Sequence, residues 1–178
     1  MVASISITLP PQDDVLKAVG EGIQAFAMVE CALTFVYASL MKPADTHLCF
    51  TTLEAARNLE TKLRIVAAVG RQKLSGEDAQ VFTALINRIG RRAQLRHKLA
   101  HWSVSYWPRA HTREEIMNWR VALTPPIHLE MHDPVMDGKI PPIHLNQIQE
   151  FCAKCNTLIK DLFNFSLKID SITQNGQE

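Results

Sequence analysis

The sequence contains few cysteines and no excess of charge of either sign. Four cysteines, at positions 31, 49, 152 and 155, are too few for a disulfide framework in a chain of 178 residues. Lys and Arg number 19 against 18 Asp and Glu, for a formal net charge of +1. This balance excludes a strongly basic nucleic-acid-binding arm and an acidic tail. Hydrophobic residues make up 47% and charged residues 21%, which is typical of a folded globular protein.

The chain also lacks a long uninterrupted apolar run. Its first eleven residues have neither a basic start nor an apolar stretch, so no signal peptide is expected. The longest apolar stretch, Ile23–Met41, is interrupted by Gln24, Glu30 and Thr34. A membrane span needs about 20 nearly uninterrupted apolar residues. We therefore expect a buried helix here, no membrane contact and a cytoplasmic protein.

Apolar residues that recur at steps of three and four predict four helices. On the first, a stripe of large apolar side chains lies beside a stripe of small ones, as in a helix central to a bundle or at a subunit interface. The second and third helices begin at the capping boxes of Thr51 and Ser75, and Gly70 is expected to end the second. The four helices are predicted over residues 13–41, 51–70, 75–101 and 144–172.

The pattern changes between the third and fourth helices. Residues 102–107 alternate and are rich in aromatic and β-branched residues, which predicts a strand, and residues 119–123 are expected to return beside it. Residues 124–143 contain five prolines and predict an irregular loop. The expected fold is mainly α: an antiparallel four-helix bundle with a small β-hairpin, residues 102–123, inserted between helices 3 and 4. It forms a single domain over residues 13–173, with tails at residues 1–12 and 174–178.

Charge is distributed unevenly along the chain. Residues 79–113 contain no Asp or Glu, and they hold seven of the 19 Arg and Lys residues together with three histidines. The other residues carry 12 basic against 18 acidic side chains. The near-zero total is therefore compatible with a local basic surface that binds the phosphate of RNA or of a nucleotide. A solvated face without a ligand is the alternative.

Three arginines, Arg88, Arg92 and Arg96, are four residues apart and lie on one side of the third helix. Arg96 also continues the core-facing stripe of that helix, where an unpaired guanidinium is costly. Glu30 interrupts the apolar stripe of the first helix and is the expected partner of Arg96. The pair either clamps two helices together or orients Arg96 toward an anion.

The third helix is expected to end in the string Arg96-His97-Lys98-Leu99-Ala100-His101. This string resembles the signature of the HEPN superfamily, in which a helical bundle carries Arg-x(4–6)-His with a polar residue directly after the arginine. His97 matches the polar position, and the Leu-Ala-His portion matches many members. Trp102 stands where those members have glycine. The resemblance covers residues 14–172 only as a helical pattern.

The resemblance implies a homodimer in which two motifs face one cleft. For many members it implies a metal-independent endoribonuclease of toxin–antitoxin or defence systems, with an antitoxin-type protein as a further partner and no metal or cofactor. Other members have lost catalysis and bind RNA, nucleotide or a partner protein, or serve only in assembly. The sequence leaves these alternatives open.

The residue types of the motif suit cleavage of RNA without a metal. Such cleavage needs a base that titrates near neutral pH for the 2′-hydroxyl, and a cation for the charge that develops on the phosphate. His101 can supply the base, Arg96 the cation, and His97 is auxiliary. Substrate binding is expected from Arg88, Arg92 and Lys98. On an ideal helix Arg96 and His101 lie about 140° apart, so either the helix ends before His101 or a second subunit completes the site.

Several other features have competing interpretations. His101 can instead hydrogen-bond the last carbonyls of its helix. His128, His132 and the acids beside them could bind Zn²⁺, but they lie in the predicted proline-rich loop. Cys152 and Cys155 are expected to be buried thiols, because no second pair accompanies them. The hairpin aromatics either stack on bases or pack on the face of the hairpin.

Overall fold

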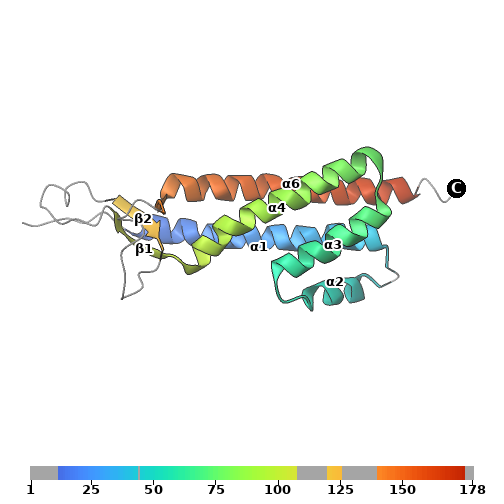
Figure 1. The fold of residues 1–178 in the computed structure, drawn as a ribbon, viewed down its shortest axis with the longest axis horizontal. Coiled ribbons are helices and arrows are strands. Elements are labelled where there is room, and N and C mark those ends of the chain that lie inside the picture. Colours follow the sequence, from blue (N-terminus) through green and yellow to red (C-terminus); the bar gives the residue numbers. More distant parts are fainter. Residues whose placement is uncertain (1–11, 44, 108–119, 126–139, 175–178) are drawn as a thin grey trace, which may run out of the picture. The chain divides into compact units, whose positions relative to one another are not determined.

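The structure, a computed structural model, describes residues 12–43, 45–107, 120–125 and 140–174. These residues are mainly helical with a small antiparallel sheet, as the sequence predicts (Figure 1). Their helices are α1 (Asp13–Met41), α2 (Thr46–Glu54), α3 (Leu59–Lys73), α4 (Gly76–His101) and α6 (Leu145–Gln174). Their strands are β1 (Ser103–Trp107), β2 (Arg120–Thr124) and β3 (Ile143–His144).

Contacts divide the chain into two compact units. The sheet unit comprises residues 1–23 and 97–150, and the helical unit comprises residues 24–96 and 151–178. Helices α1, α4 and α6 each contribute residues to both units, because the boundaries fall inside them. The single domain expected over residues 13–173 stays a prediction.

In the helical unit, α1 and α6 run parallel. Phe26 of α1 lies 6.3 Å from Phe151 of α6, and Phe35 of α1 lies 5.4 Å from Phe163 of α6, measured between ring centroids. Residue numbers therefore rise together along the two helices. Both the large and the small apolar stripes of α1 are largely buried here, as expected of a central helix; the fully buried members are Phe26, Val29, Ala32, Leu33 and Val36.

Helix α4 runs antiparallel to α6 in the same unit. Asp78, near the start of α4, pairs with Lys168 near the end of α6, and the carboxylate oxygen lies 2.6 Å from the ammonium nitrogen. Further along α4, Arg88 pairs with the earlier residue Asp161 at 2.6 Å. Residue numbers therefore rise along α4 while those of the paired residues fall along α6, so the two helices are antiparallel.

The second predicted helix is two helices in the structure. Asp45 caps the start of α2, because its side chain accepts a hydrogen bond from the Leu48 backbone N–H at 3.1 Å. Asn58 caps the start of α3, because its side chain accepts a hydrogen bond from the Thr61 backbone N–H at 2.8 Å. Figure 1 shows α2 turning back from the end of α1 and α3 turning again. The described chain therefore has five helices where four are expected, and a four-helix bundle is not confirmed.

Gly70 does not end a helix, contrary to the prediction. Helix α3 continues through it to Lys73, and Gly70 is buried against the ring of Phe82 on α4. A β-carbon at this position would overlap the ring. The glycine is there for the close approach of α3 to α4 and not for a helix stop.

The sheet unit contains the predicted hairpin strands. β1 pairs antiparallel with β2, with Ser103 opposite Thr124 and Trp107 opposite Arg120. β3 adds a third strand through the pairing of Leu123 with Ile143. Its first residue, Ile143, was predicted to end the irregular loop, and its second, His144, to begin the last helix. Leu123 is fully buried and Ile143 is buried, so the sheet carries its own apolar contacts. The rest of the predicted turn and loop lies outside the described residues.

Helix α1 is long and apolar enough to cross a membrane by length and composition alone. In this structure 56% of its most apolar window is buried inside the protein. Its apolar residues therefore form much of the helical unit's core, in agreement with the buried helix that the interrupted sequence predicts.

Candidate functional site

The two histidines of the motif lie close together at the end of α4. His97 and His101 are both exposed, their ring centroids are 4.4 Å apart and their planes are inclined at 51°. They are one helical turn apart on the same face, which explains the contact. The Lys98 ammonium lies 4.9 Å from the centre of the Trp102 ring, in a cation–π contact.

The helix extends through His101, so the first of the two expected geometries does not occur. Arg96 and His101 belong to the same regular helix, and five residues of helix place them about 140° apart around its axis. Helix geometry alone therefore directs them to different faces of α4. Of the two expectations, completion by a second subunit is the one that stays a prediction.

Arg96 lines a pocket in the helical unit. The pocket has a volume of about 530 Å³ and is formed by α1, α2, α3 and α4. Both apolar and charged side chains line the pocket. The lining residues are Ala27, Glu30, Cys31, Thr34, Phe35, Phe50, Glu54, Lys62 and Arg96. Phe35 and Phe50 meet edge to face at 5.2 Å. The structure thus brings Arg96 and Glu30 to one pocket, as expected.

The expected ion pair between Glu30 and Arg96 is not among those formed in the described chain. Glu30 instead lies 3.9 Å from the ammonium nitrogen of Lys62. That nitrogen also donates hydrogen bonds to both carboxylate oxygens of Glu54, at 2.9 and 2.8 Å. The correction has a simple physical reason: α3 supplies a buried cation closer to Glu30 than the one on α4.

Lys62 is the pocket residue that the sequence analysis missed. Its side chain is only 10% exposed. In the sequence, the apolar residues Leu59, Leu63 and Val66 recur at steps of three and four and point to a buried face through Leu63. In the structure the buried positions of α3 are instead Lys62, Val66 and Gly70. Steps of four along these three residues are the signal that could have identified a lysine on the buried face.

We expect Lys62 to stabilise the fold more through its stem than through its charge. Lys62→Met keeps the length of the side chain and leaves Glu30 and Glu54 in reach of water, so the free energy of unfolding should change by less than about 1 kcal/mol. Lys62→Ala removes the packed stem as well and should cost about 1 kcal/mol more. Urea denaturation of both variants measures the difference, and equal losses would contradict it.

Two of the predicted substrate-binding arginines face α6. Arg88 forms an ion pair with Asp161 of α6. The Arg88 side chain is 33% exposed and the Asp161 side chain 39%. Arg92 lies near Cys155, whose pKa burial raises to about 11 while the guanidinium partly opposes the shift. Of the two thiols predicted to be buried, Cys155 is fully buried, whereas Cys152 is only partly buried.

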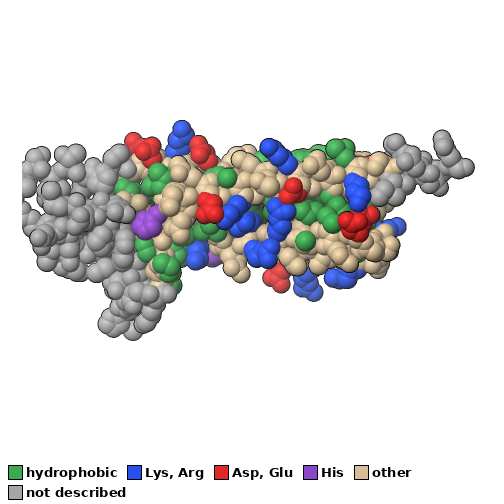
Figure 2. Space-filling model, turned by 90° about the horizontal axis from the view of Figure 1, so that it is seen from above, with side chains coloured by type: hydrophobic (Ala, Val, Ile, Leu, Met, Phe, Trp, Pro, Cys, Tyr) green, Lys and Arg blue, Asp and Glu red, His purple; other side chains and the backbone are tan. Residues whose placement is uncertain are grey.

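Arg88, a residue of the basic segment, is paired with an acidic residue of α6. On the face drawn in Figure 2, Lys and Arg side chains lie beside Asp and Glu side chains. The pairs Arg88–Asp161 and Lys168–Asp78 are examples of this mixing.

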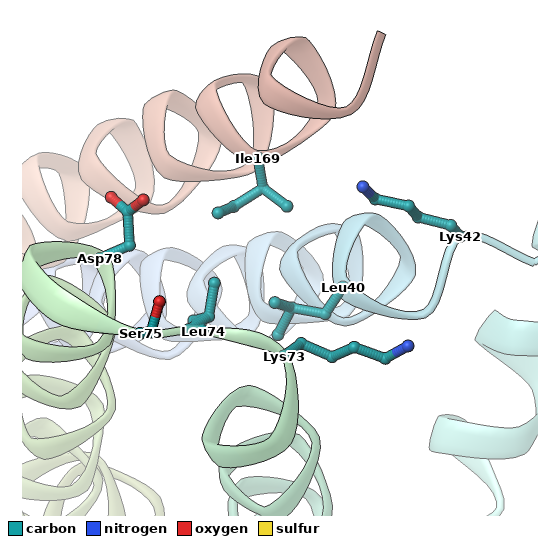
Figure 3. A pocket seen from close by; sticks show the side chains of 7 residues that line it. All are labelled: Leu40, Lys42, Lys73, Leu74, Ser75, Asp78 and Ile169. Atoms are coloured by element: carbon teal, nitrogen blue, oxygen red, sulfur yellow. The ribbon is translucent and has the colours of Figure 1, made fainter. Parts of the chain in front are cut away.

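The other features singled out from the sequence lie elsewhere. His128, His132 and Trp119 are outside the described residues, and within those that are described no three His, Cys, Asp or Glu side chains gather as metal ligands. A separate cavity of about 270 Å³ has Leu40, Leu74 and Ile169 on its walls, with Lys42 and Lys73 toward one side and Ser75 and Asp78 toward the other (Figure 3). It contains none of the residues predicted for function.

The residues predicted for catalysis thus fall in two places, one in each unit. One is the exposed histidine pair, and the other is the partly buried Arg96 in its charged pocket. Comparison with known proteins adds no relative: no protein-family model, no curated protein and no solved structure matches the chain.

Proposed function

We propose that this protein is a HEPN-like, metal-independent endoribonuclease that acts as a homodimer in a toxin or defence system. The observation that carries the proposal is the exposed His97–His101 pair at the end of α4, in the same motif as Arg96. An exposed imidazole is accessible to a large substrate such as RNA. On the same resemblance we place the protein in the cytoplasm, without a cofactor, and with an antitoxin-type protein as a further partner.

In this proposal His101 removes the proton from the 2′-hydroxyl, whose oxygen then attacks the adjacent phosphate. The bond from phosphorus to the 5′-oxygen of the next nucleotide breaks, so the products are a 2′,3′-cyclic phosphate and a 5′-hydroxyl that takes up a proton. Arg96 stabilises the charge on the phosphate oxygens through its fork of N–H donors. His97, one turn from His101 on the same face, assists in proton transfer, and Lys98 contributes to holding the RNA backbone. None of these roles requires a metal ion.

The proposed site is composite because the two catalytic groups leave α4 in different directions. With about 140° between them, the Arg96 of one chain is expected to act together with His101 of the partner subunit. A two-fold axis through the cleft then produces two equivalent sites per dimer.

Mixing two inactive variants tests this arrangement. Arg96→Ala and His101→Ala chains, mixed in equal amounts and allowed to exchange subunits, should regain roughly a quarter of wild-type activity. Half of the dimers are then mixed, and each mixed dimer has one intact site of two. The measurement is cleavage of RNA in the presence of EDTA, before and after exchange.

The control replaces His101→Ala with the double variant Arg96→Ala/His101→Ala, which supplies no arginine and should restore nothing. If subunits exchange and the first mixture stays inactive, the composite site is wrong. If the protein binds RNA but neither the wild type nor any mixture cleaves it, the non-catalytic binding module replaces the nuclease.

A further inference from the structure

His97 and His101 have a geometry that suits a second role. They lie at positions i and i+4 on the regular part of α4, both exposed, with ring centroids 4.4 Å apart. Both belong to the sheet unit, so their relation is fixed within one compact part of the molecule. Two neutral imidazoles one turn apart present two nitrogen ligands to the same point in solvent.

We propose that His97 and His101 form a two-ligand chelate site for a late first-row divalent cation, with Cu²⁺ bound most tightly. A bond between imidazole nitrogen and Zn²⁺ is about 2.0–2.1 Å long. Two nitrogens on one such cation are therefore at most about 4 Å apart, which is close to the centroid separation of 4.4 Å. Imidazole is a preferred ligand of Cu²⁺, Ni²⁺ and Zn²⁺, and Cu²⁺ leads this series in affinity.

The surroundings of the pair favour a cation. His101 is the last residue of α4, where the unsatisfied carbonyls give the helix terminus a partial negative charge. The ammonium of Lys98, which lies about 100° around the helix from His97 and about 60° from His101, is held over the Trp102 ring at 4.9 Å. Water completes the coordination, because the described residues place no third metal-binding side chain with the pair.

The inference does not depend on the proposed nuclease activity. Binding needs neither RNA nor a second subunit, and it is measured on the full chain alone. A protein without nuclease activity would still bind the metal, and a nuclease that bound no metal would overturn only the chelate site.

The experiment is titration of the untagged full chain with Cu²⁺ by isothermal calorimetry. His97→Ala and His101→Ala should each weaken the tightest binding at least tenfold, roughly the least that loss of a linked second ligand produces. The control His47→Ala removes an exposed histidine of α2 and should leave the affinity unchanged.

A spacing variant separates chelation from histidine content. Gln94 is exposed on α4, seven residues before His101. Gln94→His/His97→Ala therefore keeps two histidines but places them about 10 Å apart along the helix. It should bind Cu²⁺ as weakly as His97→Ala alone. Wild-type affinity in this variant, or in His101→Ala, would overturn the proposal.

Discussion

Substituting alanine for His101 is expected to slow the cleavage of RNA by about 10²–10⁴-fold, the usual contribution of a general base. The His101 imidazole is the only group in the proposed mechanism that accepts the 2′-hydroxyl proton. Without it, Arg96 can still stabilise the charge on the phosphate, but no group removes the proton. Because His101 is exposed at the end of α4, the substitution should leave the fold intact. Circular dichroism checks the fold, and product formation with EDTA present measures the rate.

Two controls make the result specific to the proposed chemistry. His47→Ala removes another exposed histidine, on α2 and outside the motif, and should cleave at the wild-type rate. An RNA with one 2′-deoxynucleotide should resist cleavage at that position, because the attacking oxygen is missing. Equal rates for wild type and His101→Ala, or cleavage at the deoxynucleotide, would contradict the mechanism.

Substituting alanine for Gly70 is expected to destabilise the protein by about 2 kcal/mol. The added β-carbon overlaps the ring of Phe82, and overpacking of this kind costs about 1–3 kcal/mol. Phe82 cannot move aside freely, because it is 4% exposed and stacks on Phe165 with ring centroids 5.9 Å apart. This loss of stability should exceed the stabilisation that comes from the higher helix propensity of alanine, which is at most about 1 kcal/mol.

Gly90→Ala is the matched control for Gly70→Ala. Gly90 also lies inside a helix, but a β-carbon there meets nothing within 4 Å. We expect Gly90→Ala to stabilise the protein by up to about 1 kcal/mol. The midpoint of urea denaturation should therefore rise for Gly90→Ala and fall for Gly70→Ala. In a Phe82→Leu background, Gly70→Ala should cost at least about 1 kcal/mol less. An unchanged cost would contradict the contact between α3 and α4.

The parts of the fold that the sequence predicted are those encoded locally. The long periodic helices and the two strands of the hairpin follow from side-chain spacing over many residues. β3 has two residues, Ile143 and His144, and exists because β2 pairs with it, so no local pattern could indicate it. Asp45 caps the start of α2, and Asn58 caps the start of α3 after the break between the two helices. The sequence analysis took the capping box at Thr51 as a helix start and missed both caps.

The sequence predicted that Glu30 and Arg96 lie on buried faces of their helices, but it did not predict their ion-pair partners. Glu30 and Arg96 were placed on core-facing stripes, and both do line one pocket. Their ion pair was not predictable, because the position of Lys62 depends on where α3 begins, which Asn58 sets. The engagement of Arg88 by Asp161 likewise depends on the packing of α4 on α6. Both ion pairs join residues far apart in the sequence, so they follow from tertiary packing and not from local sequence patterns.

The boundary between the two units has a consequence for truncating or recombining the protein. It falls within α1 after Ile23, within α4 after Arg96 and within α6 after Glu150. Expressing one unit alone would cut three helices and create new termini whose N–H and C=O groups lack partners. The cut in α4 would also separate Arg96 from His101. Any shortened or recombined version that keeps the motif must therefore keep both units.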